Sequence, residues 1–140
     1  MRWMIDTNIF LDVLIEREPF YKDSKVILEA CESHKVQGFI SASSATDIFY
    51  LVRKHFHNNE LAYKALGAVL DIVKVLTVTN EDVIAAYVQR AVDFEDCLLA
   101  VCAKANQCDA VITRNKKDFF AFGIAVLTPA EALDLISKDK

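Results

Sequence analysis

Residues 1–14 read MRWMIDTNIFLDVL, and this stretch joins a short apolar run directly to a helical pattern. The run at 2–6 ends in Asp6 and is typical of a buried strand. Thr7 is a suitable residue to open a helix, and the apolar spacing after it predicts a helix through Leu14. A strand followed at once by a helix is the unit from which parallel sheets are built.

The rest of the chain repeats this alternation. Further strands are expected at 39–41, 75–77, 109–113 and 125–127, and further helices at 21–36, 44–56, 60–73, 80–91, 94–106 and 129–137. Gly38 is interpreted as the residue that breaks the second helix. Spacing predicts the core-facing stripe of the 94–106 helix to be Phe94, Leu98, Val101 and Ala105. Strands separated throughout by helices predict an α/β fold with a parallel sheet.

Composition supports one soluble domain over residues 1–140. A chain of 140 residues that is 54% hydrophobic can bury a substantial core, and three glycines and two prolines leave no room for a long linker. No run approaches the roughly 20 apolar residues that span a membrane, and the N-terminus reaches an acid too early for a signal peptide. We therefore expect a cytoplasmic protein that does not enter the membrane.

Net charge and the cysteine pattern exclude further classes of protein. The net charge of −4 disfavours a protein that coats DNA without sequence preference, although it leaves nucleic acid open as a substrate. No C-x2-C pair is present, so we interpret the cysteines as small buried thiols and not as a disulfide framework or zinc site. These cysteines are Cys31, Cys97, Cys102 and Cys108.

Several acids share a position near the start of an expected helix: Asp6, Asp47, Asp93, Asp96 and Asp118. Because the carboxyl ends of parallel strands lie along one edge of a sheet, side chains at these positions converge there. Capping is the alternative explanation, strongest for Asp47, Asp93 and Asp118, because helix N-termini favour acids. Asp6 is harder to explain as a cap, since Thr7 is the better candidate.

Carboxylates that meet in one pocket require a cation, and their hard oxygen atoms select Mg²⁺ or Mn²⁺ over zinc. Two such ions about 4 Å apart can activate water for attack on a phosphodiester and stabilise the leaving oxygen. Three basic residues follow the 109–113 strand directly and are candidates for binding substrate phosphates, or else form a solvated turn: Arg114, Lys116 and Lys117.

Four segments of the chain resemble PIN-domain proteins of the kind that serve as the toxin in VapBC-type toxin–antitoxin pairs. They are MIDTNIFLDVL, SASSATDIFYLVRK, DFEDCLLAVCAKANQCDAVITRNKKDF and VLTPAEAL, in this order along essentially the whole chain. The resemblance implies a three-layer α/β/α sandwich with a central, mainly parallel five-stranded sheet. It also implies a ribonuclease that binds one or two Mg²⁺ or Mn²⁺ ions and cuts single-stranded RNA.

The resemblance also assigns roles to individual residues. Asp6 matches the first-strand acid, Asp96 the acid that opens the long helix, and Asp93 an additional acid of the DFED branch. Asp47 stands where the family usually carries Glu. The fourth metal ligand falls on Asn115 or Asp118, and two further residues, Asn8 and Thr113, match positions that support the site by hydrogen bonding.

For partners, the resemblance implies an RNA substrate, a small antitoxin whose helix lies in a groove of the toxin, and a homodimer. Two alternatives remain at this stage. One is a catalytically inactive PIN-like scaffold. The other is a Mg²⁺-binding receiver or phosphatase-type domain, which would need an Asp in VLTVTN or a second acid at Asn8.

Overall fold

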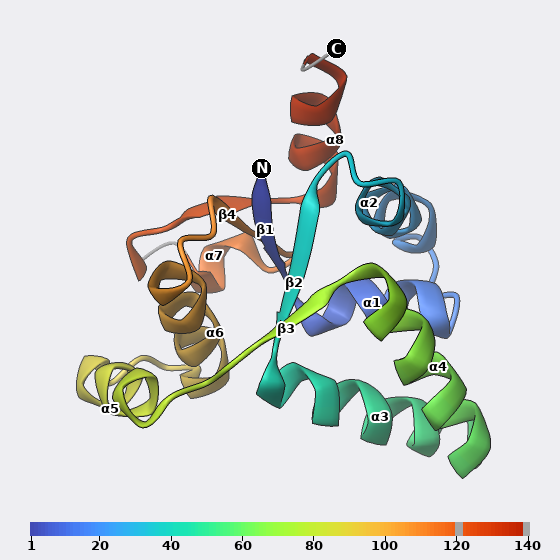
Figure 1. The fold of residues 1–140 in the computed structure, drawn as a ribbon, viewed down its shortest axis with the longest axis horizontal. Coiled ribbons are helices and arrows are strands. Elements are labelled where there is room, and N and C mark those ends of the chain that lie inside the picture. Colours follow the sequence, from blue (N-terminus) through green and yellow to red (C-terminus); the bar gives the residue numbers. More distant parts are fainter. Residues whose placement is uncertain (120–121, 139–140) are drawn as a thin grey trace.

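The computed structural model describes residues 1–119 and 122–138, and of Asp118 it describes the backbone alone. Its centre is a five-stranded sheet in the order β3-β2-β1-β4-β5, and each pair of neighbouring strands is parallel (Figure 1). The strands are β1 Arg2–Ile5, β2 Gln37–Ser41, β3 Lys74–Leu76, β4 Ala110–Ile112 and β5 Ala125–Leu127. Each overlaps its predicted range, so the predicted parallel five-stranded sheet is confirmed.

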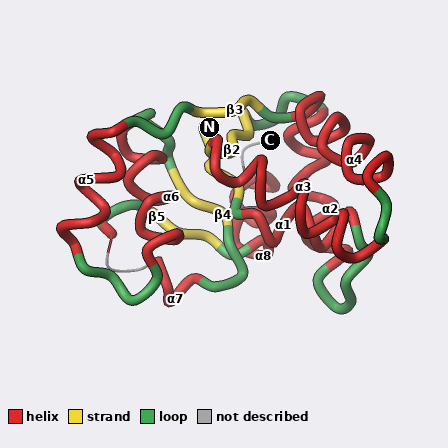
Figure 2. Tube along the Cα trace, turned by 90° about the horizontal axis from the view of Figure 1, so that it is seen from below, coloured by secondary structure: helices red, strands yellow, loops and turns green. Residues whose placement is uncertain are grey.

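Helices cover both faces of this sheet. They are α1 Thr7–Leu14, α2 Tyr21–Glu32, α3 Ala42–Phe56, α4 Asn59–Ile72, α5 Asn80–Gln89, α6 Phe94–Ala105, α7 Lys116–Phe119 and α8 Pro129–Lys138. Figure 2 shows α5, α6 and α7 on one side of the strands and α1 to α4 on the other. The three-layer α/β/α architecture is therefore present. Helix α7 was not predicted, because its four residues, KKDF, are mostly charged and read as a turn.

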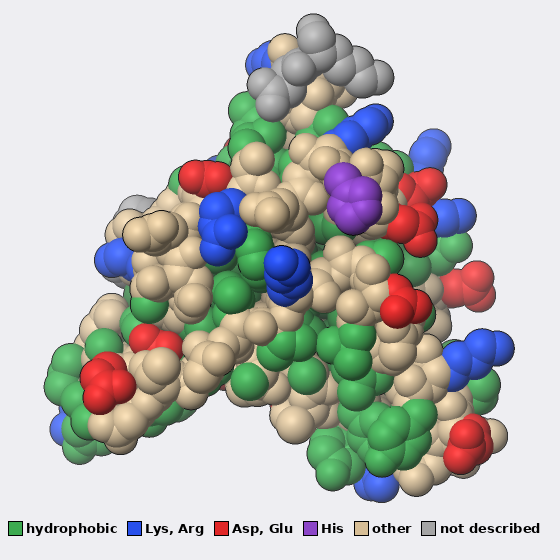
Figure 3. Space-filling view, in the orientation of Figure 1, with side chains coloured by type: hydrophobic (Ala, Val, Ile, Leu, Met, Phe, Trp, Pro, Cys, Tyr) green, Lys and Arg blue, Asp and Glu red, His purple; other side chains and the backbone are tan. Residues whose placement is uncertain are grey.

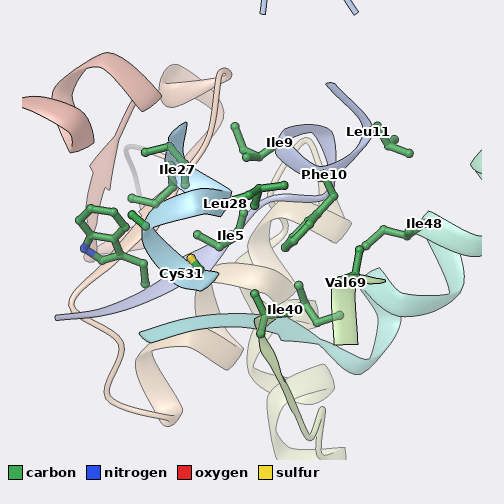
Figure 4. Packing of buried hydrophobic residues seen from close by; sticks show 14 of the residues in the cluster. Ile5, Ile9, Phe10, Leu11, Ile27, Leu28, Cys31, Ile40, Ile48 and Val69 are labelled. Carbon is green, nitrogen blue, oxygen red and sulfur yellow. The ribbon is translucent and has the colours of Figure 1, made fainter. Parts of the chain in front are cut away.

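The alternation of side chains along the strands divides the core into two clusters. In β1, Trp3 and Ile5 face the cluster formed with α1 and α2, whereas Met4 faces the cluster formed with α6. In β2, Ile40 and Phe39 divide in the same way. Figure 4 shows the first cluster, in which β1 and β2 meet side chains of the covering helices, among them Ile9, Phe10, Ile27, Leu28 and Ile48. The β1 strand is thus buried on both faces, as expected for the centre of a parallel sheet.

Gly38 has a different role from the predicted one. Helix α2 already ends at Glu32, and His34 follows with a positive φ of 62°. Gly38 lies inside β2, where an added Cβ would come within 2.6 Å of the Cys31 Sγ and 2.9 Å of a Val73 methyl group. The residue therefore permits close packing of α2 on the sheet and does not break the helix.

The predicted core stripe of α6 was also wrong. Phe94 is 45% exposed, and the buried residues of the helix are Cys97, Leu99, Ala100, Cys102 and Ala103. The reason is that α6 is covered twice, by the sheet and by α5, so its small residues face the neighbours. Contact with α5 is shown by the Cys97 thiol, which donates to the Ala86 carbonyl oxygen over 3.8 Å.

The prediction that the cysteines are buried thiols is confirmed, because all four are free and buried. Burial raises the pKa of Cys31 to about 12. Burial is also the main cause that raises the pKa of Cys102 to about 11. These thiols therefore stay protonated and unreactive at neutral pH.

Among the described residues, no helix has the length and apolar character needed to cross a membrane.

Candidate active site

The predicted acids meet in one cleft of about 390 Å³ at the carboxyl edge of the sheet. Its walls come from the start of α1, the middle of α3, the start of α6 and the segment after β4. The lining residues are Asp6, Thr7, Asn8, Asp47, Tyr50, Leu51, Asp93, Glu95, Asp96 and Asn115. The structure thus brings together four of the five predicted acids. The fifth, Asp118, has its backbone in α7, and its side chain lies outside what the structure describes.

Asp6 is the most buried of these acids, with 7% of its surface exposed. It continues the sheet through a backbone hydrogen bond from its N–H to the Ile112 carbonyl oxygen at 3.0 Å. The Thr113 hydroxyl donates to Asp6 Oδ2 at 2.7 Å and accepts from the Asn115 N–H at 3.0 Å. Thr113 is fully buried, so it fixes the orientation of the Asp6 carboxyl and links it to the segment that carries Asn115.

Burial raises the pKa of Asp6, and the hydrogen bond from Thr113 opposes that shift, as does the positive charge of Arg114. The negative charge of Asp93 acts in the same direction as burial. Asp6 stands at the N-cap position of α1, but its side chain makes no capping hydrogen bond. Capping therefore does not account for this carboxylate.

Capping does account for part of the role of Asp93. Its Oδ1 accepts a hydrogen bond from the Asp96 N–H at 3.0 Å and so caps α6. The cap of α3, by contrast, is Ser41, whose hydroxyl accepts from the Ser44 N–H at 3.2 Å. Asp47 lies a turn further along α3, half-buried in the wall of the cleft, and capping does not explain its position.

Glu95 was missed as a site residue, although its carboxylate is the third acid of DFED. A side-chain hydrogen bond with Asp47 is the main cause that raises the pKa of Glu95 to about 7, with further contributions from burial and from the charges of Asp47, Asp93 and Asp6. The Glu95 carboxyl therefore keeps its proton up to near neutral pH, where it is hydrogen-bonded with Asp47. The signal in the sequence was the density of acids, but two helices must meet before this pair can form.

The donor set of the cleft fits a hard divalent cation. Its oxygen donors are carboxylates and the amide groups of Asn8 and Asn115, the ligand types that Mg²⁺ and Mn²⁺ prefer. The pKa of Asp6 is raised mainly by burial and that of Glu95 mainly by its hydrogen bond with Asp47, and the negative charge of neighbouring acids adds to both shifts. A bound cation would relieve this last contribution. Within the described residues, no three acidic, histidine or cysteine side chains already close on one point. The carboxylates line the cleft and would turn inward to bind an ion.

The basic residues after β4 do not line this cleft. Arg114 instead binds the buried carboxylate of Asp12, with its Nε 2.8 Å from Oδ2 and its Nη2 3.0 Å from Oδ1. The guanidinium carbon also lies 3.8 Å from the centre of the Phe20 ring. Lys116 pairs with Glu131 at the surface, and Lys117 is exposed. Arg114 is thus part of a structural ion pair, and its contact with substrate phosphate stays a prediction.

Asp12 itself was missed by the sequence analysis, since it reads as the polar residue of an amphipathic helix. It is completely buried and also accepts a hydrogen bond from the Ser24 hydroxyl at 2.9 Å. The pair joins α1 and α2 to the segment between Thr113 and Asn115, which borders the cleft. Asn8 is held from the same side, because Arg17 Nη1 donates to its side-chain oxygen at 3.3 Å.

Comparison with known proteins places this architecture in a family. The model of the PIN domain matches residues 2–117. The DNA-bound VapBC of Salmonella typhimurium is similar in structure, with 19% identity and a TM-score of 0.72 over 92% of this chain and 98% of that chain. VapBC2 from Rickettsia felis, bound to a fragment of its promoter DNA, shows 17% identity and a TM-score of 0.68 over 91% and 98%.

VapC20 of Mycobacterium tuberculosis, a toxin that cleaves the sarcin–ricin loop, shows 15% identity and a TM-score of 0.68 over 88% of this chain and 96% of that chain. At these identities the similarity shows a shared fold. No curated protein sequence matches the chain. Because the family model matches most of the chain, the protein belongs to the PIN domain family.

Proposed function

We propose that the protein is an endoribonuclease that uses Mg²⁺ or Mn²⁺ to hydrolyse single-stranded RNA. The observation that supports this most strongly is the convergence of acids from α1, α3 and α6 in one cleft at the carboxyl edge of the sheet. Membership of the PIN domain family and the activity of VapC20 as a toxin that cleaves the sarcin–ricin loop point the same way. The receiver and phosphatase alternatives are set aside with the family assignment.

In this proposal Asp6, Asp93 and Asp96 would hold one or two ions, and Asn115 or Asp118 would complete the site. When bound, the ions would supply activation of a water for attack on the phosphorus and stabilisation of the charge on the leaving oxygen. Thr113 keeps the Asp6 carboxyl in a fixed orientation through its 2.7 Å hydrogen bond. No histidine, serine or cysteine is among the residues that line the cleft, so the chemistry relies on its carboxyls and on bound water.

The pair of Asp47 and Glu95 has a separate role in the cleft. The proton that Glu95 keeps near neutral pH reduces the negative charge there. A bound cation would favour the ionised form of Glu95 and would therefore lower its pKa. The shorter Asp47, which stands where relatives usually carry Glu, is thereby supplemented by a glutamate from α6.

An RNA cleavage assay tests the proposal. Labelled single-stranded RNA is incubated with the protein in Mg²⁺, in Mn²⁺ and in EDTA, and cleavage is expected with the metals only. Asp6→Asn and Asp96→Asn keep the side-chain shape and should abolish cleavage, whereas Asp71→Asn, an exposed acid at the opposite edge of the sheet, should not. Metal-dependent cleavage that survives both cleft substitutions refutes the nuclease assignment. Binding without any cleavage favours the inactive scaffold.

We further propose that this nuclease is the toxin of a cytoplasmic toxin–antitoxin pair. Several similar structures are toxin–antitoxin complexes, including one from Klebsiella pneumoniae with 23% identity and a TM-score of 0.66 over 90% of this chain. Expression should arrest growth of a bacterial host, Asp96→Asn should relieve the arrest, and a small antitoxin should restore growth and co-purify. Growth that continues with active enzyme present contradicts the toxin role.

A homodimer is also part of the proposal. Helix α5 exposes large apolar side chains on one face, with Ile84 53%, Tyr87 56% and Val88 64% exposed. Such a row on an otherwise charged surface marks an association face. Sedimentation should show a dimer, and Val88→Glu should shift it to the monomer without unfolding it. A wild-type monomer at high concentration contradicts this part.

A further inference from the structure

A row of basic and aromatic side chains runs along α3 away from the acidic cleft. Asp47, Tyr50 and Lys54 are separated by three or four residues and therefore lie on one face of the helix, and His57 stands at its C-terminal cap. A second cleft of about 690 Å³ lies at the end of this row, lined by Tyr50, Arg53, Lys54, His57, Asn58 and Asn59. Tyr50 belongs to the walls of both clefts. The two are thus neighbours that share one aromatic side chain.

The acidic cleft cannot by itself attract a polyanion. Affinity for nucleic acid comes largely from cations that contact phosphates, and the carboxylates of the cleft serve the metal instead. Two of the basic side chains near β4 are already paired, Arg114 with Asp12 and Lys116 with Glu131. The basic cleft that shares Tyr50 is the neighbouring surface with the required charge.

The Tyr50 ring offers an exposed aromatic surface on which a flat ligand can stack. Its side chain stays 55% exposed even though the Arg53 guanidinium carbon lies 5.0 Å from the centre of its ring. The edge-to-face contact with Phe49, with ring centres 5.2 Å apart, supports the ring from the helix side. A held but exposed aromatic ring beside an arginine is the arrangement on which bases of single strands stack. In Figure 3, hydrophobic side chains gather at the lower right, over α3 and α4.

We propose that Tyr50, Arg53, Lys54 and His57 form a binding subsite for single-stranded RNA next to the point of cleavage. Tyr50 stacks a base, and Arg53 and Lys54 bind phosphates that flank the cleaved one. The spacing fits, because Asp47 and Lys54 are about 10 Å apart along the helix axis at about 1.5 Å per residue. This inference rests on the proposed nuclease function and names the residues that hold its substrate.

The test measures binding separately from cleavage. A labelled single-stranded RNA is titrated with the Asp96→Asn protein in EDTA, and the dissociation constant is followed by fluorescence anisotropy over a range of salt concentrations. In this background, Lys54→Gln and Arg53→Gln should each reduce the slope of log K against log salt by about 0.7, the value for one phosphate contact on a single strand. Lys74→Gln is the matched control, because Lys74 is an exposed lysine at the opposite edge of the sheet.

Stacking is tested with two substitutions of the same ring. Tyr50→Leu should weaken binding about tenfold, as expected when one stacked base loses its aromatic partner. Tyr50→Phe keeps the ring and should bind within a factor of about two of the parent, so it separates stacking from any effect on folding. Circular dichroism of each variant checks that α3 is intact.

The outcomes distinguish this inference from the function on which it rests. If the wild-type protein cleaves RNA but the Tyr50→Leu, Arg53→Gln and Lys54→Gln variants bind it as Lys74→Gln does, the subsite is overturned and the nuclease assignment stands. If these variants keep RNA affinity and lose a protein partner instead, the surface is a protein contact and the inference is again overturned. If the wild-type protein neither binds nor cleaves RNA, both proposals fail together.

Discussion

The ion pair between Asp12 and Arg114 provides the sharpest test of how the edge of the cleft is held. Asp12 has no exposed surface on its side chain, and the Arg114 side chain is 19% exposed. Two hydrogen bonds of 2.8 and 3.0 Å join them, and the Ser24 hydroxyl adds a third at 2.9 Å. Replacing Asp12 by Ala leaves a buried guanidinium without its partner, and Ser24 loses its acceptor.

Removing one member of a buried pair costs about 3–5 kcal/mol of the free energy of unfolding. A domain of this kind has a total stability of about 5–15 kcal/mol, so Asp12→Ala should remove a large part of it. Asp134→Ala is the matched control, because Asp134 pairs with Lys138 at 3.8 Å while its side chain is 76% exposed. Loss of that surface pair should cost about 0.5 kcal/mol or less.

Urea denaturation followed by the fluorescence of Trp3 measures both variants, because the chain has one tryptophan and it is fully buried. The double variant Asp12→Leu with Arg114→Leu removes both charges and should lose less stability than Asp12→Ala alone. If Asp12→Ala is no less stable than Asp134→Ala, or if the double variant shows merely the sum of its single changes, the pair does not hold this region and the reasoning is refuted.

The remaining predictions concern packing, pH and metal. Gly38→Ala should destabilise the protein by about 1–3 kcal/mol, because the new methyl group meets Cys31 and Val73, whereas Gly67→Ala in open space on α4 should stabilise it by about 0.5–1 kcal/mol; both are measured by urea denaturation. Without metal, stability should fall as pH rises from 4.5 to about 7, because the folded protein keeps a proton on Glu95 that the unfolded chain has released. Glu95→Gln should flatten that part of the pH profile, and an unchanged profile contradicts the raised pKa of Glu95. Addition of Mg²⁺ to the wild-type protein near pH 7 should release protons into weakly buffered solution, and Glu95→Gln should release fewer.

Much of the fold could be predicted because a parallel sheet imposes strong rules on the sequence. Each central strand is a short apolar run followed by a helix, and several acids stand near the starts of helices, where the carboxyl edge of the sheet was expected. Asp6, Asp47, Asp93 and Asp96 could therefore be predicted to converge, and in the structure all four line one cleft. These features depend on local order along the chain and on one topological rule.

What could not be predicted depends on contacts between elements distant in the sequence. The buried face of α6 is set by α5 and the sheet together, and helical spacing cannot reveal a helix that is covered on two sides. Gly38 is needed because of Cys31 and Val73, which approach it from α2 and from the residue before β3. Arg114 lies 102 residues from Asp12, so neither residue indicates the other in the sequence.

The cap formed by Asp93 has a consequence for how this protein can diverge. One oxygen of its carboxylate accepts a hydrogen bond from the Asp96 N–H and so stabilises the first turn of α6. That turn carries Glu95 and Asp96, which line the cleft. Asn at this position would keep the capping hydrogen bond and remove a negative charge. A descendant with that single substitution would retain its fold while the negative charge of the cleft falls, so the architecture and the charge of the cleft can evolve separately through one side chain.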